Sequence, residues 1–314
     1  MKSAEPQAAN EAFEPARAVS WYESSARARV ALLLDPGSFV EFIGPEQREV
    51  SPHLRVFDLP EQFDDGIVVG RGLLAGKPVF VAAQEGRFMG GAFGEVHGAK
   101  LTGLLHAARD LGSIPVLILF DTGGVRLQEA NAGELAIAEI MRAVVEARLA
   151  DAPVVGLIGG RAGCYGGGGL IAACCSALAV SEQGRIAVSG PEVIETNRGV
   201  EEFDSHDRAL VWRTMGGKHR RLLGAAQTFV DDTVEAFREA ALRFLAQPSH
   251  LGPRALQAEQ SRLEDRLRRF GACGDAVDIW RAEGVPEPEA VPELPADQFI
   301  ALADKVRRPS HDDR

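Results

Sequence analysis

The feature that most constrains the fold is a repeated order of apolar run, glycine-rich turn and helical pattern. Residues 114–120 (IPVLILF) lead into the glycines of residues 121–130 (DTGGVRLQEA), and residues 152–160 (APVVGLIGG) lead into residues 161–169 (RAGCYGGGG). Short apolar runs bounded by glycines are typical of buried strands. Strands that alternate with helices pair in parallel through right-handed crossovers. This order therefore predicts an α/β protein.

The same alternation continues on both sides of these two units. Residues 66–84 contain two β-rich runs around a turn at 75–78, and residues 95–112 have helical spacing. Further along, the pattern predicts a helix over 127–149, a short buried helix over 170–175, strands over 177–182 and 184–190, and a helix that begins at Pro191. The helix over 127–149 is predicted to bury Leu135, Ile137, Ile140, Met141, Val144 and Val145. Because paired strands precede the helices and the units follow one another like turns of a coil, we expect a ββα superhelix rather than a plain Rossmann sheet.

Length and composition suit a globular chain with one main domain. The chain has 314 residues, 46% of them hydrophobic, which is enough for a sizeable core. Residues 1–20 are rich in Ala, Glu and Pro, and Pro alternates with Glu after residue 284. We therefore expect a mobile arm over 1–20, a single domain over 21–283, and a Pro- and Glu-rich tail with a short last helix over 284–314.

Charge and cysteine usage argue against several classes of protein. A formal net charge of −11 disfavours a nucleic-acid groove or an anionic membrane surface, because both need clustered Lys and Arg. No apolar run is long enough to cross a membrane, and the N-terminal residues lack the apolar core of a signal peptide. The four cysteines have no CxxC spacing, so neither a zinc ribbon nor a disulfide framework is predicted. We expect a cytoplasmic protein without a nucleic-acid or membrane partner.

The two glycine turns stand at corresponding places in successive units. Gly123-Gly124 and the run Gly166 to Gly169 each lie between the end of a strand and the start of a helix. Free backbone N–H groups and the helix dipole favour negative charge there, so the two turns could converge on one oxyanion. For a single turn, relief of crowding is the more frequent role of glycine. Two equivalent turns favour a binding site, and neither turn has the residues that complete a Walker A or GxGxxG phosphate loop.

The sequence gives weaker indications of a catalytic role for its other reactive side chains. The sequence has no GxSxG elbow, HExxH motif or metal-ligand cluster. His97 and His106 fall on a predicted helix, where an exposed or core role is more frequent than catalysis. Cys164 precedes a helix start, yet we interpret it as a small buried residue that lines the pocket rather than as a thiolate.

Two charged segments leave their roles open. Arg126, Gln128 and Glu129 either orient the glycine turn or face a partner subunit, and Gln128 and Glu129 could instead satisfy the first turn of the following helix. Residues 204–221 mix charge with Trp212 and Met215. That mixture suits a subunit contact or a cap over an acyl pocket, and a solvated helix face is the alternative.

Four motifs in this order and spacing resemble the carboxyltransferase branch of the crotonase superfamily. They are FMGGAFGEVHGAK (88–100), DTGGVRLQEA (121–130), YGGGG (165–169) and SGPEVIE (189–195). Within that branch, residues 203–224 (FDSHDRALVWRTMGGKHRRLLG) resemble the β subunits of biotin-independent malonate decarboxylases, which are related to the carboxyltransferase β subunits of acetyl-CoA carboxylase. The resemblance covers residues 21–232, and the zinc ribbon of bacterial acetyl-CoA carboxylase β subunits is not among the motifs.

This resemblance implies a crotonase fold and a decarboxylation of malonyl-S-acyl-carrier-protein to acetyl-S-acyl-carrier-protein and CO₂. The thioester enolate would be stabilised in a backbone oxyanion hole, whose donors are carried over as Gly124 or Val125 and Gly166 or Gly167. Because the YGGGG loop needs one gap to align, the donor in that loop is assigned to within one residue. The motifs carry over a set of substrate-binding residues: Phe88, Gly90, Gly91, Gly123, Cys164 and Tyr165.

The resemblance also implies partners. These are a homologous γ subunit that completes the active site, an α subunit with acyl transferase activity, and an acyl-carrier subunit. The substrate would be carried on the CoA-like prosthetic group of the carrier, with no cofactor or metal bound by this chain. Two alternatives stay open: a carboxyltransferase β subunit of a biotin-dependent acyl-CoA carboxylase, and a non-catalytic scaffold of the crotonase type. The sequence indicates neither the proton donor to the enolate, nor the partner's residues, nor the stoichiometry.

Overall fold

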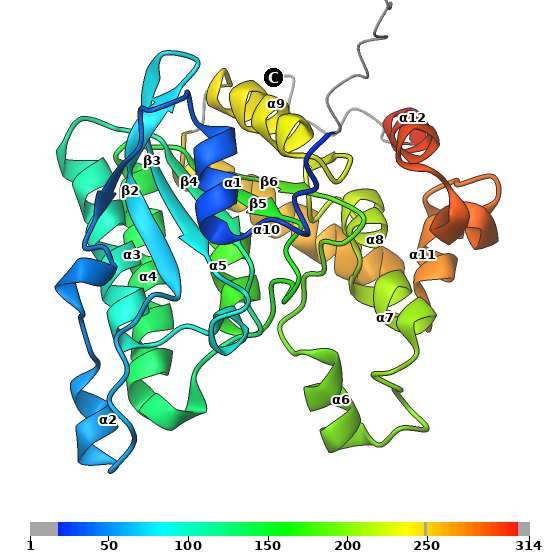
Figure 1. The fold of residues 1–314 in the computed structure, drawn as a ribbon. Helices are drawn as coiled ribbons and strands as arrows, with labels where there is room; N and C mark the ends of the chain where they lie inside the picture. The colour runs from blue at the N-terminus through cyan, green and yellow to red at the C-terminus, as the bar shows by residue number, and fades with distance from the viewer. Residues whose placement is uncertain (1–17, 248–249, 307–314) are drawn as a thin grey trace, which may run out of the picture.

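The computed structural model describes residues 18–247 and 250–306. Its centre is a seven-stranded sheet in which the spatial order of the strands is their order along the chain. The strands are β1 (Val40–Phe42), β2 (Ile67–Leu74), β3 (Lys77–Gln84), β4 (Val116–Phe120), β5 (Val154–Ile158), β6 (Ala177–Val180) and β7 (Thr228–Phe229). β1 to β3 pair antiparallel and β3 to β7 pair parallel. The predicted α/β class is confirmed, and each unit lies beside the preceding one as in a coil (Figure 1).

A second ladder crosses the turns that follow the strands, and it consists of single bridges. Phe93 pairs with Val125, Thr122 with Cys164, and Cys164 with Ile186, all parallel. The prediction of a regular strand over 184–190 was therefore wrong, because in that segment only Arg185 and Ile186 form bridges. Each bridging segment is short because the chain turns at once toward its next helix. These bridges nevertheless tie the turns of successive units to one another.

Helices cover both faces of the sheet. The α-helices of the described residues are α1 (Ala26–Leu33), α2 (Pro52–Val56), α3 (Glu95–Asp110), α4 (Asn131–Leu149), α5 (Gly167–Cys174), α6 (Pro191–Arg198), α7 (Arg208–Met215), α8 (Gly217–Leu222), α9 (Val234–Leu245), α10 (Pro253–Phe270), α11 (Ala276–Ala282) and α12 (Ala296–Val306). α1 and α9 pack on one face with Val68, and α3, α4 and α5 pack on the other with Val69. Successive strand residues point to opposite faces, so the sheet is buried on both sides. The described residues contain no helix long and apolar enough to cross a membrane.

α4 differs from its prediction at its start and on its surface. Residues Leu127–Glu129 form a separate 3₁₀ turn, and the helix begins at Asn131. Ile137, Ile140 and Val144 are buried as expected. Leu135 and Val145 are 63% and 38% exposed, which contradicts the prediction, because the buried stripe contains Ala136, Ala143 and Ala147 in their place. Small alanines let α4 approach the neighbouring helices closely.

The C-terminal segment packs onto the same core as the sheet. Val285, Val291 and Phe299 are buried in one cluster with residues of β4 and β5. The rings of Phe229 in β7 and Phe299 in α12 lie 4.7 Å apart in an edge-to-face arrangement. The described part of the predicted tail, up to residue 306, thus contributes apolar side chains to the domain. The arm over 1–17 and residues 307–314 lie outside the described residues.

Candidate active site

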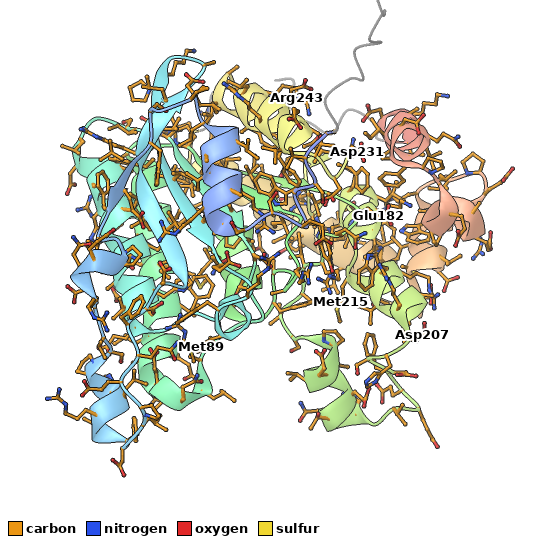
Figure 2. All side chains as sticks on the ribbon, in the orientation of Figure 1. Met89, Glu182, Asp207, Met215, Asp231 and Arg243 are labelled. Carbon is orange, nitrogen blue, oxygen red and sulfur yellow. The ribbon has the colours of Figure 1, made fainter. Side chains whose placement is uncertain are left out.

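Three turns follow three neighbouring strands at the same edge of the sheet. They are residues 88–91 after β3, residues 122–125 after β4, and residues 164–167 after β5. In Figure 2, Met89 of the first turn lies on the lower side of the molecule, the side from which α6 projects in Figure 1. The carboxyl ends of parallel strands form a common edge, which is where α/β proteins place their ligands.

Backbone contacts fix the second and third turns against each other. The Thr122 amide donates to the Gly163 carbonyl oxygen at 2.8 Å, and the Tyr165 amide donates to the Thr122 carbonyl oxygen at 3.0 Å. A Cβ placed on Gly166 would lie 3.2 Å from the Gly124 Cα. The two glycine turns predicted to form one site therefore lie in contact.

The hydrogen bonds also show which backbone amides of these turns already have an acceptor and which do not. The Gly123 amide donates to the Gly90 carbonyl oxygen at 2.8 Å, and the Gly124 amide donates to the Thr122 Oγ1 at 3.1 Å. Among the described residues, the amides of Val125, Gly166 and Gly167 have no acceptor. Free backbone donors at a helix start are suited to hold negative charge. Of the two residues carried over for the first donor, Val125 is the one whose amide is available.

Backbone conformation explains why glycine stands at two of these positions. Gly166 is the N-cap of α5 with φ +56° and ψ −129°, a conformation that residues with a Cβ rarely adopt. At Gly91 a Cβ would lie 1.7 Å from the Asp121 carbonyl oxygen, so the first turn can approach the second only without a side chain. The glycines thus allow the three turns to pack backbone against backbone.

The substrate-binding candidates divide into surface and core positions. Phe88 lines a cavity of about 250 Å³ together with Met89, Arg126 and Gln128. Gly90, Gly91 and Gly123 form the contacts between the first and second turns. Cys164 is fully buried, and burial raises the pKa of its thiol well above the usual range. A neutral thiol in the core cannot act as a nucleophile, which agrees with its interpretation as a small buried residue.

Tyr165 connects the third turn to the helices over residues 203–224. Its ring is 5% exposed and packs against Val211 and Met215 of α7. Its hydroxyl is buried, and burial raises the pKa of this group. The guanidinium of Arg185 lies 4.7 Å from the Trp212 ring. The sequence left open whether this segment is a subunit contact, a cap or a solvated helix face. In the structure, α7 covers the side chain of Tyr165, so it is not a fully solvated helix.

Arg126 and Glu129 form a buried ion-pair cluster beside the second turn, and the Glu129 carboxylate bonds to the start of α3 rather than to the start of α4. The Arg126 Nη1 lies 2.5 Å from the Asp64 Oδ2 and 3.2 Å from the Glu129 Oε1, and all three residues are buried. The Glu129 Oε2 accepts the Glu95 amide at 2.6 Å, so it satisfies the first turn of α3 in the preceding unit. Gln128 is exposed, and its side-chain amide donates to the Met89 sulfur at 3.9 Å.

Sequence reasoning missed a second buried ion pair at the other end of this turn. The Arg29 Nη1 donates to the Asp121 Oδ2 at 2.8 Å, and both residues are at most 3% exposed. An acidic residue directly after an apolar strand was an available indication, since a buried carboxylate needs a partner. Its partner is 92 residues away, so spacing alone could not identify Arg29.

The two candidate histidines, His97 and His106, lie among contacts that are structural. His97 is fully buried, its Nε2 lies 3.2 Å from the Gln84 amide nitrogen, and burial lowers its pKa to about 3. The Nε2 of His106 in α3 lies 3.7 Å from the Glu146 carboxylate of α4. Among the described residues, Glu195, Asp204 and His206 bring three possible metal ligands together near α6, but the Glu195 carboxylate already accepts the Ser205 amide. This cluster lies at the projecting α6 loop and not in the glycine turns.

Comparisons with known proteins identify the family of the chain. A family described as the carboxyl transferase domain matches residues 23–246. The malonyl-S-ACP:biotin-protein carboxyltransferase MADC of Malonomonas rubra is 39% identical over 92% of this chain and 96% of its own length. The propionyl-CoA carboxylase β chain of Saccharopolyspora erythraea is 34% identical over 56% of this chain, which matches only 31% of that longer protein.

Solved structures give the same assignment. A Pseudomonas malonate decarboxylase hetero-tetramer in complex with malonate contains a chain that is 40% identical, with a TM-score of 0.77, over 85% of this chain and 98% of that one. A Pseudomonas MdcD-MdcE hetero-dimer of malonate decarboxylase contains one that is 38% identical, with a TM-score of 0.64, over 80% of this chain and 96% of that one. The predicted crotonase-like carboxyltransferase fold is thereby confirmed, and the chain belongs to the carboxyl transferase domain family.

Proposed function

We propose that the chain is the malonate decarboxylase subunit that converts malonyl-S-acyl-carrier-protein to acetyl-S-acyl-carrier-protein and CO₂. The observation that carries this proposal is the pair of contacting turns with free amides at Val125 and at Gly166 and Gly167. Near full-length similarity to a malonyl-S-ACP carboxyltransferase and to a malonate decarboxylase chain supports the substrate class.

The chemistry follows from where charge develops. The bond between the malonyl α-carbon and its carboxylate breaks, CO₂ leaves, and the electron pair moves onto the thioester carbonyl oxygen. Val125 N–H and an amide of Gly166 or Gly167 would donate to this oxygen, which becomes the enolate oxyanion. Preorganised donors stabilise such an oxyanion more than the neutral carbonyl, so they lower the barrier. The enolate carbon then takes a proton, and neither a nucleophile nor a metal is required for these steps.

An exposed apolar rim near the turns supports a partner that completes the site. Leu127 follows the second turn and is 87% exposed, and Val188 follows the bridge at Ile186 and is 66% exposed. Val193 on α6 is also exposed. Large apolar side chains left exposed beside a site are a feature of protein interfaces. We propose that the homologous γ subunit covers this edge, and that the acyl-carrier and α subunits deliver the thioester.

Carboxyl transfer to biotin is the second candidate, and a specific observation favours it. The Malonomonas rubra relative is named a biotin-protein carboxyltransferase, and its 39% identity is equivalent to the 40% identity of the Pseudomonas decarboxylase chain. The same oxyanion hole would serve both reactions, because both generate the thioester enolate. Overall similarity therefore does not separate the two reactions.

The test is to reconstitute the complex with its co-expressed partners and follow CO₂ release from malonyl-S-carrier with and without excess avidin. Direct decarboxylation predicts unchanged CO₂ release under avidin and no biotinylated protein in the complex. Loss of CO₂ release under avidin, with carboxylated biotin formed in its absence, would assign carboxyl transfer instead. A complex that releases no CO₂ and carboxylates no biotin would contradict both reactions.

A further inference from the structure

Buried charges stand at both ends of the second glycine turn. Asp121 directly precedes Thr122, Arg126 directly follows Val125, and each of the two charged residues is 3% exposed. Each has an ion-pair partner from a distant part of the chain, 92 residues away for Asp121 and 62 residues away for Arg126. The segment with the free Val125 amide is thus held at both ends by groups outside its own unit.

The Asp121 carboxylate joins three units of the superhelix. Its Oδ2 accepts from the Arg29 guanidinium at 2.8 Å, and its Oδ1 accepts the Ala162 amide at 2.6 Å. Ala162 lies in the loop that leads into the third turn. A Cβ on Gly86 would lie 2.5 Å from the Asp121 Oδ1, and one on Gly160 would lie 2.2 Å from its Cγ. The carboxylate therefore occupies a slot between the segments that follow β3 and β5.

The Arg126 guanidinium fixes the other end in a fork geometry. It contacts both carboxylate oxygens of Asp64, at 2.5 and 3.2 Å, and also the Glu129 Oε1 at 3.2 Å. Cβ atoms placed on Gly66 and Gly94 would lie 2.7 and 2.6 Å from its terminal nitrogens. A planar fork between two carboxylates and two glycines allows one orientation of the side chain.

On the basis of the function proposed above, we infer that the Arg29–Asp121 and Asp64–Arg126 pairs are positioning pairs. They hold the Val125 amide at the angle and distance that the enolate oxygen requires. Buried ion pairs add little stability relative to well-packed apolar residues, so stability alone does not account for two of them around one four-residue turn. Their directional contacts instead fix a backbone that has glycine at two of its four positions. A misplacement of about 1 Å at a reacting group can cost roughly 10²-fold in rate.

The test uses substitutions that keep size while they change one property. Arg126→Lys keeps the charge and loses the fork, and Asp121→Asn keeps the shape and loses the charge. The matched control is Arg238→Lys, because Arg238 of α9 pairs with Asp35 at 2.6 Å, and Asp35 accepts the Ala75 and Gly76 amides of the β2–β3 turn, at the other end of β3 from the first turn. The assembled complex is assayed for kcat and KM with malonyl-S-carrier. Binding of acetyl-S-carrier and of a nitronate analogue of the enolate, together with thermal melting, is measured on the same samples.

We expect Arg126→Lys and Asp121→Asn to lower kcat by about 10²-fold and to weaken nitronate binding in proportion. KM and acetyl-S-carrier binding should stay within about threefold of wild type, as should all values for Arg238→Lys, because ground-state contacts are unchanged. If kcat stays within threefold of wild type, or if acetyl and nitronate binding weaken equally, the positioning role is refuted. If Asp121→Asn fails to assemble, Arg126→Lys and Glu129→Gln decide the question by the same criteria.

Failure of the proposed function can be distinguished from failure of the positioning role. A wild-type complex that releases no CO₂ contradicts the decarboxylase assignment, whatever the variants do. Nitronate binding still reports the geometry of the turn in that case, since carboxyl transfer passes through the same enolate. Unequal loss of nitronate and acetyl binding would then support the positioning pairs, and equal loss would overturn them.

Discussion

Gly166→Ala tests the third turn most directly. Gly166 has φ +56° and ψ −129°, and a Cβ there would lie 3.2 Å from the Gly124 Cα, which belongs to the opposing turn. Strain from a non-glycine residue in this region costs about 1–3 kcal/mol. The fold should survive, because Ala130 has nearly the same conformation, φ +47° and ψ −134°, as the N-cap of α4.

The expected kinetic effect follows from the size of the overlap. A Cβ at 3.2 Å from backbone must be relieved by a shift of a few tenths of an ångström between the two turns. Since about 1 Å of misplacement costs roughly 10²-fold, this shift predicts a loss of kcat of about four- to tenfold. The upper limit is the loss of a whole oxyanion donor, about 10²–10³-fold or roughly 3–4 kcal/mol.

The assay is CO₂ release by the reconstituted complex, with thermal melts on the same samples. Gly103→Ala is the matched control, because Gly103 lies inside α3 and a Cβ there has nothing within 4 Å. That substitution should leave kcat unchanged and raise stability by about 0.5–1 kcal/mol. Gly167→Val is a less specific test of the turn. A Cβ at Gly167 would lie 2.5 Å from the Ile137 Cδ1, so this substitution would also disturb core packing. A Gly166→Ala enzyme within threefold of wild-type kcat would refute the assignment of this turn to the oxyanion.

Four further predictions concern the partner subunit, cofactors, a buried thiol and two buried histidines. The isolated chain should be inactive on malonyl thioester and gain activity with its homologous partner, so full activity of the single purified subunit would contradict the shared site. Neither avidin nor EDTA should lower CO₂ release, and restoration by zinc after EDTA would reveal a metal site. Cys164 should resist alkylation at pH 8 in the native complex, because burial raises the pKa of its thiol, and mass spectrometry after iodoacetamide checks this. Burial lowers the pKa of His97 and His219 to about 3, so protons bind preferentially to the unfolded state. The free energy of unfolding should therefore fall as the pH drops below about 6.5, by up to roughly 1.4 kcal/mol per pH unit for each histidine. Urea unfolding at pH 7 and at pH 5 measures this effect, and equal midpoints at the two pH values would refute the prediction.

The sequence by itself determined the order of units and the position of the glycine turns. Apolar runs such as residues 114–120 require burial on both faces, which only a covered parallel sheet provides. A turn such as the one at Gly166 needs a conformation that other residues rarely adopt, and that requirement is local to the chain. Fold class and candidate turns could therefore be predicted from neighbouring residues alone.

Only the tertiary structure decided which amides are free and what holds them. Gly124 and Val125 were equivalent candidates in sequence, and the choice depends on whether the Thr122 hydroxyl folds back onto one of them. The exposure of Leu135 and the absence of a regular strand over 184–190 depend on how closely neighbouring elements pack. The Arg29–Asp121 pair joins residues 92 positions apart, and the cost of burying either charge alone is repaid only by a partner that the superhelix brings to it. Spacing along a chain reports local conformation, whereas contacts between distant residues exist only once the units have stacked.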